Sequence, residues 1–377
     1  MSFHKLRTFT KTILIAINFL MSLGLIIGCY GKYFTGEKLW FTGLFTLGSF
    51  YFLLFILAFF FFWIFAKPVF SLLSIGTVLI CWQPLKHLVQ IRLSPNFILQ
   101  KHPSNIRVMS WNVEHFDILE HKTHPERKQQ MIDMINSYQP DVACFQEVVA
   151  GEKPKSINNL QQIMNQLGFT YYHYSFNPKL DFDENHHFGI IIFSRLPIIN
   201  KSTVSFAPND YNSIFQYVDV VRAADTFRVF NIHLQSLKFS DKNRIYLDEP
   251  TLKDQQDLIR TTSIISKLRT GFLKRSQQSN HIRQSMDSSK YPVIVCGDLN
   301  DVPNSYSYFI IGEKMKNAFA EKGTGIGRTF YSVSPTLRID DIFCDERFSV
   351  QQFVRVKKKL SDHYPLIADL FYTSSAL

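Results

Sequence analysis

Three long apolar runs without a charged side chain fill most of the first 85 residues. They cover residues 12–30, 39–66 and 68–85, and the first follows Lys5, Arg7 and Lys11. A helix needs about 20 apolar residues to cross the ~30 Å hydrocarbon core of a bilayer. The middle run is long enough to cross with tilt, whereas the other two are near the lower limit. We therefore expect residues 1–85 to form a membrane anchor with three transmembrane helices.

Other interpretations of these runs stay open. The first run has the basic start and apolar centre of a secretory signal peptide, and the stretch that ends at Cys29 resembles a lipoprotein cleavage site. The third run is short enough to lie at the membrane interface. The basic N-terminus favours the cytoplasmic side, so three crossings place the rest of the chain on the non-cytoplasmic side of the cell membrane. Basic residues just after the third run favour the opposite orientation.

The pattern changes after the third run. Residues 86–104 contain two prolines and no periodicity, which is typical of a linker. From residue 105 to 377, short β-like runs alternate with helical stretches, and several of these runs are apolar throughout, as in sheets covered on both faces. We expect a layered α/β sandwich. Strands are expected at residues 106–113, 142–148, 187–194, 214–221, 228–235, 293–299, 339–344 and 367–372, and helices at 126–138, 157–167 and within 252–286.

Charge and cysteine content exclude some classes of protein. The net charge is +10, but the first 100 residues hold eight Lys/Arg and one acidic residue. The remaining residues hold 33 Lys/Arg and 30 Asp/Glu, so a basic surface along the whole chain for nucleic acid is not supported. The five cysteines show no zinc-ligand spacing and no disulfide framework, which predicts buried free thiols.

Acidic, amide and imidazole side chains interrupt the ends of the apolar strands at six places. One such residue is ordinarily a turn residue, a helix cap or a satisfied core group, but six in one chain are harder to explain in this way. Carboxylate oxygens suit Mg²⁺ or Mn²⁺, and histidines supply acid–base groups near neutral pH. The interrupting residues are Asn112, Glu114, Glu147, His233, Asp298, Asn300, Asp340, Asp362 and His363.

At these positions the chain resembles the endonuclease/exonuclease/phosphatase superfamily, and its membrane-anchored bacterial branch in particular. The motifs, in order, are Ser-Trp-Asn-Val-Glu, Gln-Glu, Asn-Ile-His-Leu, Gly-Asp-Leu-Asn, Arg-Ile-Asp and Ser-Asp-His. The resemblance covers roughly residues 105–373. It implies a four-layer α/β/β/α sandwich, preceded here by transmembrane helices, with the active site at one edge of the paired sheets.

The resemblance also implies a divalent-metal site. Glu147 would be the main ligand of Mg²⁺ or Mn²⁺, with Asn112 beside it. Glu114 and Asp362 would complete the surroundings of the ion.

The other motif residues would act on the substrate. By the same resemblance, Asp298 would orient or deprotonate the attacking water, and Asn300 would hold a phosphate oxygen. His363 would contact the phosphoryl group, with its tautomer fixed by Asp340, and His233 would protonate the leaving oxygen. The spacing from the preceding arginine favours Asp340 over its neighbour Asp341 for this role.

These observations predict a membrane-anchored, Mg²⁺-dependent phosphodiester hydrolase, with an endonuclease-type enzyme acting on nucleic acid as the first choice. A lipid phosphodiesterase of the sphingomyelinase type, or a phosphoinositide phosphatase, is the alternative, because the anchor would keep the site close to lipid headgroups. A catalytically inactive interaction domain is the third interpretation of the sequence.

Overall fold

The structure is a computed structural model that describes residues 3–33, 39–92, 96–154, 156–206, 214–237, 255–332 and 334–373. The chain divides into two compact units. The anchor unit contains residues 1–90 and 301–309, and the sandwich unit contains residues 91–300 and 310–377. Each unit is described by itself.

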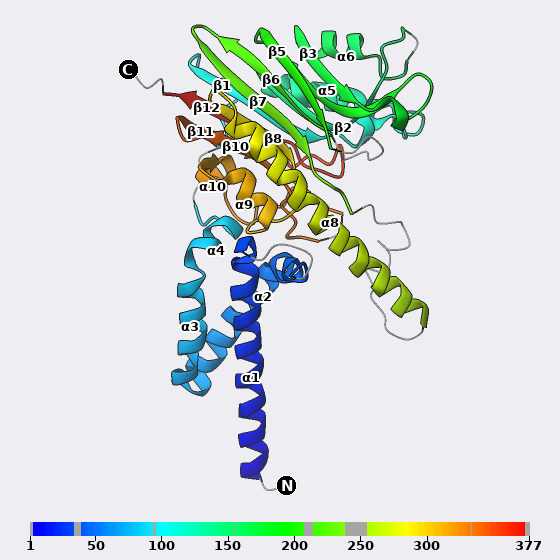
Figure 1. Cartoon of the computed structure of the whole chain (residues 1–377). Helices are drawn as coiled ribbons and strands as arrows, with labels where there is room; N and C mark the ends of the chain where they lie inside the picture. The colour runs from blue at the N-terminus through cyan, green and yellow to red at the C-terminus, as the bar shows by residue number, and fades with distance from the viewer. Residues whose placement is uncertain are drawn as a thin grey trace. The chain divides into compact units, whose positions relative to one another are not determined.

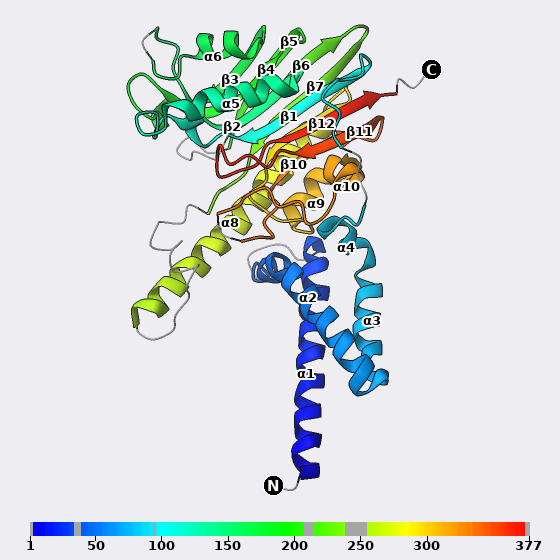
Figure 2. The ribbon, with the colours of Figure 1, turned by 180° about the vertical axis from the view of Figure 1, so that it is seen from behind.

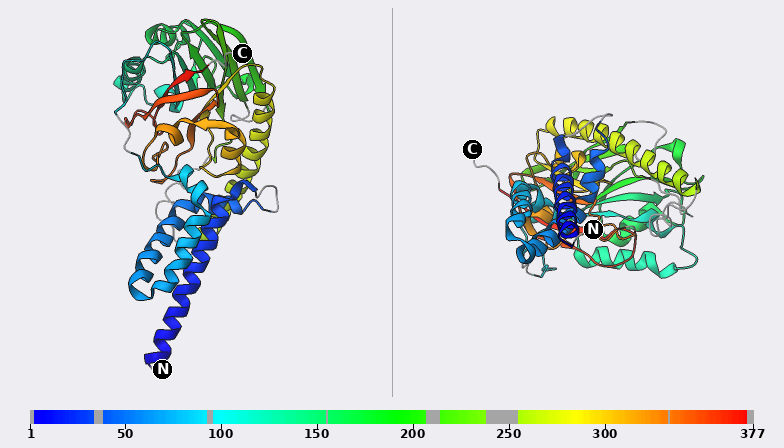
Figure 3. Two further views of the ribbon diagram at one scale, coloured as in Figure 1. Left: turned by 90° about the vertical axis from the view of Figure 1, so that its left-hand side faces the viewer. Right: turned by 90° about the horizontal axis from the view of Figure 1, so that it is seen from below.

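The anchor unit is helical. Helices α1 (Phe3–Cys29) and α2 (Thr42–Ala66) are long and apolar enough to cross a membrane. Helix α1 runs unbroken over its whole length (Figure 3). Two short 3-10 turns, η1 (Gly31–Tyr33) and η2 (Pro68–Phe70), follow α1 and α2 in the chain.

The third apolar run is a bent pair of helices rather than one straight helix. Helix α3 (Ser71–Ile80) and helix α4 (Trp82–Leu88) meet at Cys81, and the chain bends there by 70°. Pro84 explains the break, because it has no N–H to donate to the carbonyl of Ile80 four residues earlier. The Tyr30 hydroxyl donates to that carbonyl oxygen instead, at 2.7 Å. The three-helix anchor stays a prediction, with two clear candidate spans and one broken one.

The sandwich unit contains two six-stranded sheets. The strand order is β11-β12-β1-β2-β4-β3 in the first sheet and β5-β6-β7-β8-β10-β9 in the second. The strands of the first sheet are β1 (Asn105–Asn112), β2 (Val142–Ala150), β3 (Tyr171–Phe176), β4 (His187–Ser194), β11 (Phe348–Arg355) and β12 (Leu366–Tyr372). Those of the second are β5 (Ile198–Ser205), β6 (Ile214–Arg222), β7 (Asp225–His233), β8 (Val293–Asp298), β9 (Met315–Asn317) and β10 (Asp340–Asp345).

Alternation along the strands builds two apolar layers. On β1, Val108 packs between the two sheets, against residues such as Ile294 of β8. Its neighbour Met109 points to the other face, where α5 (Pro125–Tyr138) and α6 (Leu160–Leu167) cover the first sheet. Helix α8 (Gln255–Asp287) lies on the opposite side of the sandwich from α5 and α6 (Figures 1 and 2). The remaining elements are η3 (Glu114–Asp117), η4 (Pro178–Leu180), α9 (Tyr306–Gly312) and α10 (Ala318–Lys322).

The two sheets with their helices confirm the expected α/β sandwich, and all eight predicted strands are present. Four strands were missed, because β3, β5 and β11 mix polar and apolar residues and β9 has only three residues. The helix predicted from residue 157 begins at Leu160, since the Asn159 side chain caps it by accepting a hydrogen bond from Gln162 N at 3.0 Å. Residues 252–254 of the predicted third helix lie outside the described residues. The five cysteines are free and buried, as predicted.

A buried polar bridge joins the two sheets beneath the ends of β2 and β7. The Gln146 side-chain nitrogen donates to Asn231 Oδ1 at 2.7 Å. The Asn231 nitrogen in turn donates to the carbonyl oxygens of Phe145 and Ile191, at 3.0 and 2.9 Å. Both amide side chains are fully buried, so each hydrogen bond would be costly to leave unmade.

Removing this bridge should destabilise the sandwich unit. Asn231→Ala leaves one amide and two carbonyl groups in the core without their hydrogen-bond partner. We expect the free energy of unfolding to fall by about 2 kcal/mol or more. Asn165→Ala, which removes an exposed hydrogen bond within α6, should change stability by less than about 0.5 kcal/mol. Thermal unfolding of the full chain in detergent measures both. Equal melting temperatures for the two variants would show that the bridge contributes nothing.

Candidate active site

Strand pairing in the second sheet aligns three of the predicted polar residues. His233 at the end of β7 is paired with Asp298 at the end of the parallel strand β8. Asp298 is paired in turn with Asp340 at the start of the antiparallel strand β10. Residues that are paired across a sheet project their side chains to the same face. The sheet therefore places an imidazole and two carboxyl groups in one row.

Gly297 allows this row to form. A Cβ atom at this position would lie 2.0 Å from the carbonyl oxygen of Ile232 on β7, far closer than any side chain tolerates. Its φ of 156° is also unfavourable for other residues. The glycine of Gly-Asp-Leu-Asn is thus required by the close approach of β7 and β8 just before Asp298.

The first sheet contributes its residues through an irregularity in β2. The register between β2 and β4 shifts between Phe145 and Val148, and Glu147 lies in this bulge with φ of 52°. A bulge redirects the side chain of the extra residue. Asn112 ends the neighbouring strand β1, where its carbonyl oxygen accepts a hydrogen bond from the Ser361 hydroxyl at 2.7 Å. The segment before β12 is therefore fixed at the end of β1.

The residues from the two sheets meet at this edge. The Asn112 side-chain nitrogen donates to Asp298 Oδ2 at 3.3 Å. His233 Nε2 lies 3.4 Å from Glu147 Oε1 and 3.7 Å from Asp298 Oδ2. Glu147 is 25% exposed, whereas Asp298 is buried, so the Glu147 carboxylate is the more accessible of the two.

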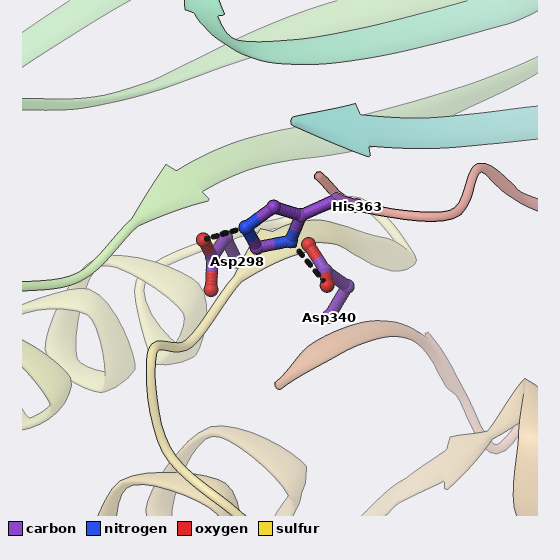
Figure 4. Close-up of side chains that lie close together, drawn as sticks. All are labelled: Asp298, Asp340 and His363. Atoms are coloured by element: carbon purple, nitrogen blue, oxygen red, sulfur yellow. Dashed lines mark hydrogen bonds and ion pairs between the residues drawn. The ribbon is translucent and has the colours of Figure 1, made fainter. Parts of the chain in front are cut away.

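His363 and Asp340 form a buried pair, shown with Asp298 in Figure 4. His363 Nδ1 is 2.8 Å from Asp340 Oδ2, and Nε2 is 3.8 Å from Asp298 Oδ2. The Trp111 indole N–H donates to the His363 carbonyl oxygen at 2.9 Å and fixes the backbone. Burial disfavours the charged imidazole, but the charges of Asp340 and Asp298 outweigh it and raise the pKa of His363 well above its usual value. The ring is thus a cation with Nε2 directed at Asp298.

The carboxyl groups of the site have opposite pKa shifts. Burial and the charge of Asp340 raise the pKa of Asp298 to about 8. Burial also acts to raise the pKa of Glu147, but the charges of His233, His115 and His363 outweigh it and leave that pKa below its usual value. Asp298 can therefore hold or release a proton near neutral pH, while Glu147 stays ionised.

A second acidic group lies beside Glu147. The backbone N–H of Asp362 donates to Glu114 Oε2 at 2.9 Å. Burial, followed by the charges of Asp362 and Glu147, raises the pKa of Glu114 to about 7. Three carboxyl groups that repel one another in this way provide hard oxygen ligands and an excess of negative charge, which fits a divalent cation.

A different group of three side chains also has metal-ligand geometry. Ligand atoms of Asp298, Asp340 and His363 lie within 4.8 Å of one another. Here, however, the hydrogen bond from His363 Nδ1 to Asp340 already balances one negative charge. The carboxylates of Glu147, Glu114 and Asp362 are more exposed than those of this group.

Two adjacent aspartates have different surroundings. Asp340 reaches His363, whereas Asp341 accepts a hydrogen bond from Asn317 Nδ2 at 2.7 Å and lies 3.8 Å from Arg338 Nε. Successive residues of a strand face opposite sides, which explains the difference. Asn300 lies in the turn after β8, where its N–H donates to Asp298 Oδ1 and its side-chain nitrogen donates to Leu234 O. The amide of Asn300 thus holds the turn that carries Asp298.

Three residues near the site were not found from the sequence. His115 lies close enough to Glu147 to stabilise its charge, and Tyr331 lies near Glu114 and Asp362, whose charges, after burial, raise its pKa. The Phe330 ring lies 4.9 Å from the His363 ring, centroid to centroid. His115 follows Glu114 directly and could have been noted, but residues 330 and 331 lie in a loop with no motif.

The comparison with known families agrees with the geometry. The model of the Endonuclease/Exonuclease/phosphatase family matches residues 109–363, which is more than half of the chain. The chain belongs to this family. A second model, described as Domain of unknown function (DUF8431), matches residues 11–88 of the anchor unit.

Individual relatives are distant. Nocturnin of Rattus norvegicus is 26% identical over 257 residues, which cover 62% of this chain and 50% of nocturnin. Protein angel homolog 2 of Danio rerio is 25% identical over 257 residues, covering 62% of this chain and 40% of that protein. The chain therefore spans about half the length of the curated relatives it matches.

Solved structures share the fold. The human nocturnin catalytic domain has a TM-score of 0.50 and 19% identity, covering 72% of this chain and 94% of that domain. An endonuclease/exonuclease/phosphatase family protein of Bacteroides thetaiotaomicron has a TM-score of 0.51 and 17% identity, covering 72% of this chain and all of that one. Members of the endonuclease/exonuclease/phosphatase family are phosphoester hydrolases and generally use divalent metals.

The family chemistry should depend on the His363–Asp340 pair. Asp340→Asn keeps the shape but removes the charge that stabilises the imidazolium, and we expect kcat for phosphoester hydrolysis to fall by ~10²-fold or more. Asp341→Asn is the matched control, because its side chain faces away from His363, and its activity should stay within about threefold of wild type. Steady-state kinetics of both variants test this. Similar losses in the two would mean that the pair acts only through stability.

Proposed function

We propose that this protein is a membrane-anchored, divalent-metal-dependent phosphodiester hydrolase that acts on nucleic acid. The observation that carries the proposal is the meeting of Glu147 with Asp298, His233 and His363 at one edge of the two sheets. This edge combines the ionised carboxylate of Glu147, a buried cationic imidazole and a carboxyl group that titrates near neutral pH.

Glu147 would hold Mg²⁺ or Mn²⁺, with Asn112, Glu114 and Asp362 completing the surroundings. The bound cation would supply positive charge to the phosphoryl oxygens as negative charge builds up on them. The protein's part is to present these oxygen ligands at the accessible end of β2.

The remaining residues would act directly on the substrate and its water. Asp298, with a pKa of about 8, would orient the attacking water and accept its proton. His363, held as a cation by Asp340, would donate a hydrogen bond from Nε2 to a phosphoryl oxygen. His233 would give a proton to the leaving oxygen, and Asn300 would hold a phosphate oxygen while it keeps the turn in place.

A basic segment beside the site supports a polyanionic substrate. Lys357, Lys358 and Lys359 are exposed and are separated from the Ser-Asp-His motif by one residue, Leu360. Lys359 Nζ lies 5.2 Å from the centroid of the Tyr331 ring, and the Tyr331 N–H donates to Asp362 O at 3.2 Å. This short cluster suits contacts with a few phosphates rather than with a long duplex. The human nocturnin catalytic domain, which shares the fold, was solved with a bound sulfate, a tetrahedral dianion like phosphate.

The anchor keeps one alternative open. Helices α1 and α2 are long and apolar enough to span a bilayer, and an anchored hydrolase would meet lipid headgroups. A lipid phosphodiesterase or phosphoinositide phosphatase therefore remains the second candidate. Turnover of sphingomyelin or a phosphoinositide in vesicles, with no cleavage of DNA or RNA, would favour this second candidate over the nuclease.

Metal dependence tests the assignment of Glu147. Chelation should abolish hydrolysis reversibly, because a site with few carboxylates binds Mg²⁺ weakly. Glu147→Gln should lower kcat by more than ~10²-fold and recover in part at higher Mg²⁺ concentration. The control is Glu126→Gln, an exposed residue at the start of α5. Hydrolysis that persists undiminished in excess chelator would refute the metal assignment.

Orientation can be tested separately. Lys5, Arg7 and Lys11 at the start of α1 favour the cytoplasmic side, so three crossings would put the sandwich unit outside. Protease added to intact spheroplasts of a bacterial expression host should then remove the sandwich unit. Digestion that occurs only after the membrane is broken would show that the sandwich unit faces the cytoplasm. That orientation is expected if only two helices cross the membrane.

A further inference from the structure

The turn that follows Asn112 has an unusual backbone. Glu114, His115, Phe116 and Asp117 all have positive φ, at 46°, 64°, 53° and 60°. Residues with a Cβ atom adopt this left-handed conformation rarely and usually singly, because the Cβ approaches the following carbonyl. Four in succession persist only where the surrounding structure enforces them, and such strain is concentrated at functional sites.

Asn158 is the residue that holds this turn. Its side-chain nitrogen is fully buried, donates to the carbonyl oxygens of Phe116 at 3.1 Å and Val149 at 3.0 Å, and lies 3.4 Å from the carbonyl oxygen of His115. Two of these carbonyls belong to the turn and the third to β2. The amide therefore ties the turn to the strand that carries Glu147.

The turn carries His115, whose ring lies beside two phenyl rings. The His115 ring centroid lies 5.7 Å from that of Phe188 and 6.3 Å from that of Phe182, with the planes tilted by 45° and 40°. Phe188 on β4 is paired with Val149 of β2, two residues after Glu147, and the charge of His115 acts to stabilise the Glu147 carboxylate. We call His115, Phe182 and Phe188 the aromatic wall. It includes a residue of β4 that is paired with the strand carrying the proposed metal ligand.

Phe182 is an exposed side chain on a turn held by several hydrogen bonds. Its side chain is 38% exposed. Its N–H donates to His186 O at 3.0 Å, and the Asp183 carboxylate accepts from Asn185 N at 2.7 Å and contacts His186 Nδ1 at 2.9 Å. The backbone that carries the ring is held in this way, so little backbone entropy is lost when a planar group packs on the ring.

We propose that the aromatic wall binds an unpaired nucleobase next to the scissile phosphate, by stacking on Phe182, so that the substrate is single-stranded nucleic acid. This inference rests on the proposed function. Stacking is the main source of affinity for single strands and tolerates any base, because every base has a π-face. In a duplex the bases are stacked on one another and cannot reach the wall.

Charge supports the same substrate. Residues 101–377 hold only three more basic than acidic residues, so phosphate contacts alone provide limited affinity. A hydrolase that neutralises few phosphates needs a second source of binding energy, and the aromatic wall supplies one beside the reacting group.

The test uses the full chain in detergent micelles and three substrates: a single-stranded oligonucleotide, the same strand with stable abasic residues, and its duplex. We expect kcat/KM of the wild type to fall by about tenfold or more on the abasic strand and on the duplex. Phe182→Ala should lower kcat/KM on the normal strand by a similar factor, mainly by raising KM. On the abasic strand, the substitution should lower kcat/KM only slightly further. Phe182→Trp should retain activity on the normal strand.

Phe371→Ala is the matched control, because Phe371 is 37% exposed on β12 and takes no part in the wall. It should cleave every substrate as the wild type does. Equal cleavage of normal and abasic strands by the wild type would overturn the inference and leave the proposed function standing. Turnover of phospholipid vesicles without cleavage of any oligonucleotide would overturn both. The comparison of normal and abasic strands uses the wild-type protein, so it tests the inference even if Phe182→Ala fails to fold.

Discussion

The candidate active site depends on the fixed register of one sheet against the other. Glu147 and Asn112 come from the first sheet, and His233, Asp298 and Asp340 from the second, so a relative shift of a single residue would separate them. Apolar packing between the sheets is not directional and cannot fix such a register alone. The buried hydrogen bonds from Gln146 to Asn231, and from Asn231 to both β2 and β4, are directional and lie directly beneath the site. Two motif residues without chemistry of their own thus determine where the reactive ones meet.

The charges of the site explain why it needs this rigid support. Asp298, Asp340 and His363 are buried, and the burial of each charged group is unfavourable unless a partner compensates it. The pair of His363 with Asp340 compensates one carboxylate, and Asp298 responds by a pKa raised to about 8. Glu114 shows the same response beside Glu147 and Asp362. A surplus of carboxylates that is poorly compensated by the protein alone is the state expected of a site that works with a cation and an anionic substrate.

Much of the fold and of the site could be predicted from the sequence, because both leave local signals. Apolar strands such as the one before Asp298 are recognisable by their residues, and a polar residue at the end of such a strand stands out. Conformation was not predictable in the same way. Nothing in Gln-Glu-Val indicates that Glu147 lies in a bulge, and Glu114–Asp117 has no glycine to suggest a left-handed turn. Asn158 lies more than 40 residues from the carbonyl groups of that turn, so its role follows only from the tertiary structure.

On the proposed function, a membrane anchor would lower the affinity that the site needs for its substrate. A soluble hydrolase must capture its substrate from dilute solution, and high affinity then requires many contacts. An enzyme confined to a membrane meets substrates that are held at or driven across the same surface, where the effective concentration of the second partner is high. Weak binding through a few lysines and one exposed ring would be sufficient under that condition. The proposed function thus accounts together for the small basic segment at Lys357–Lys359, the small net charge of the sandwich unit and the two apolar helices that precede it.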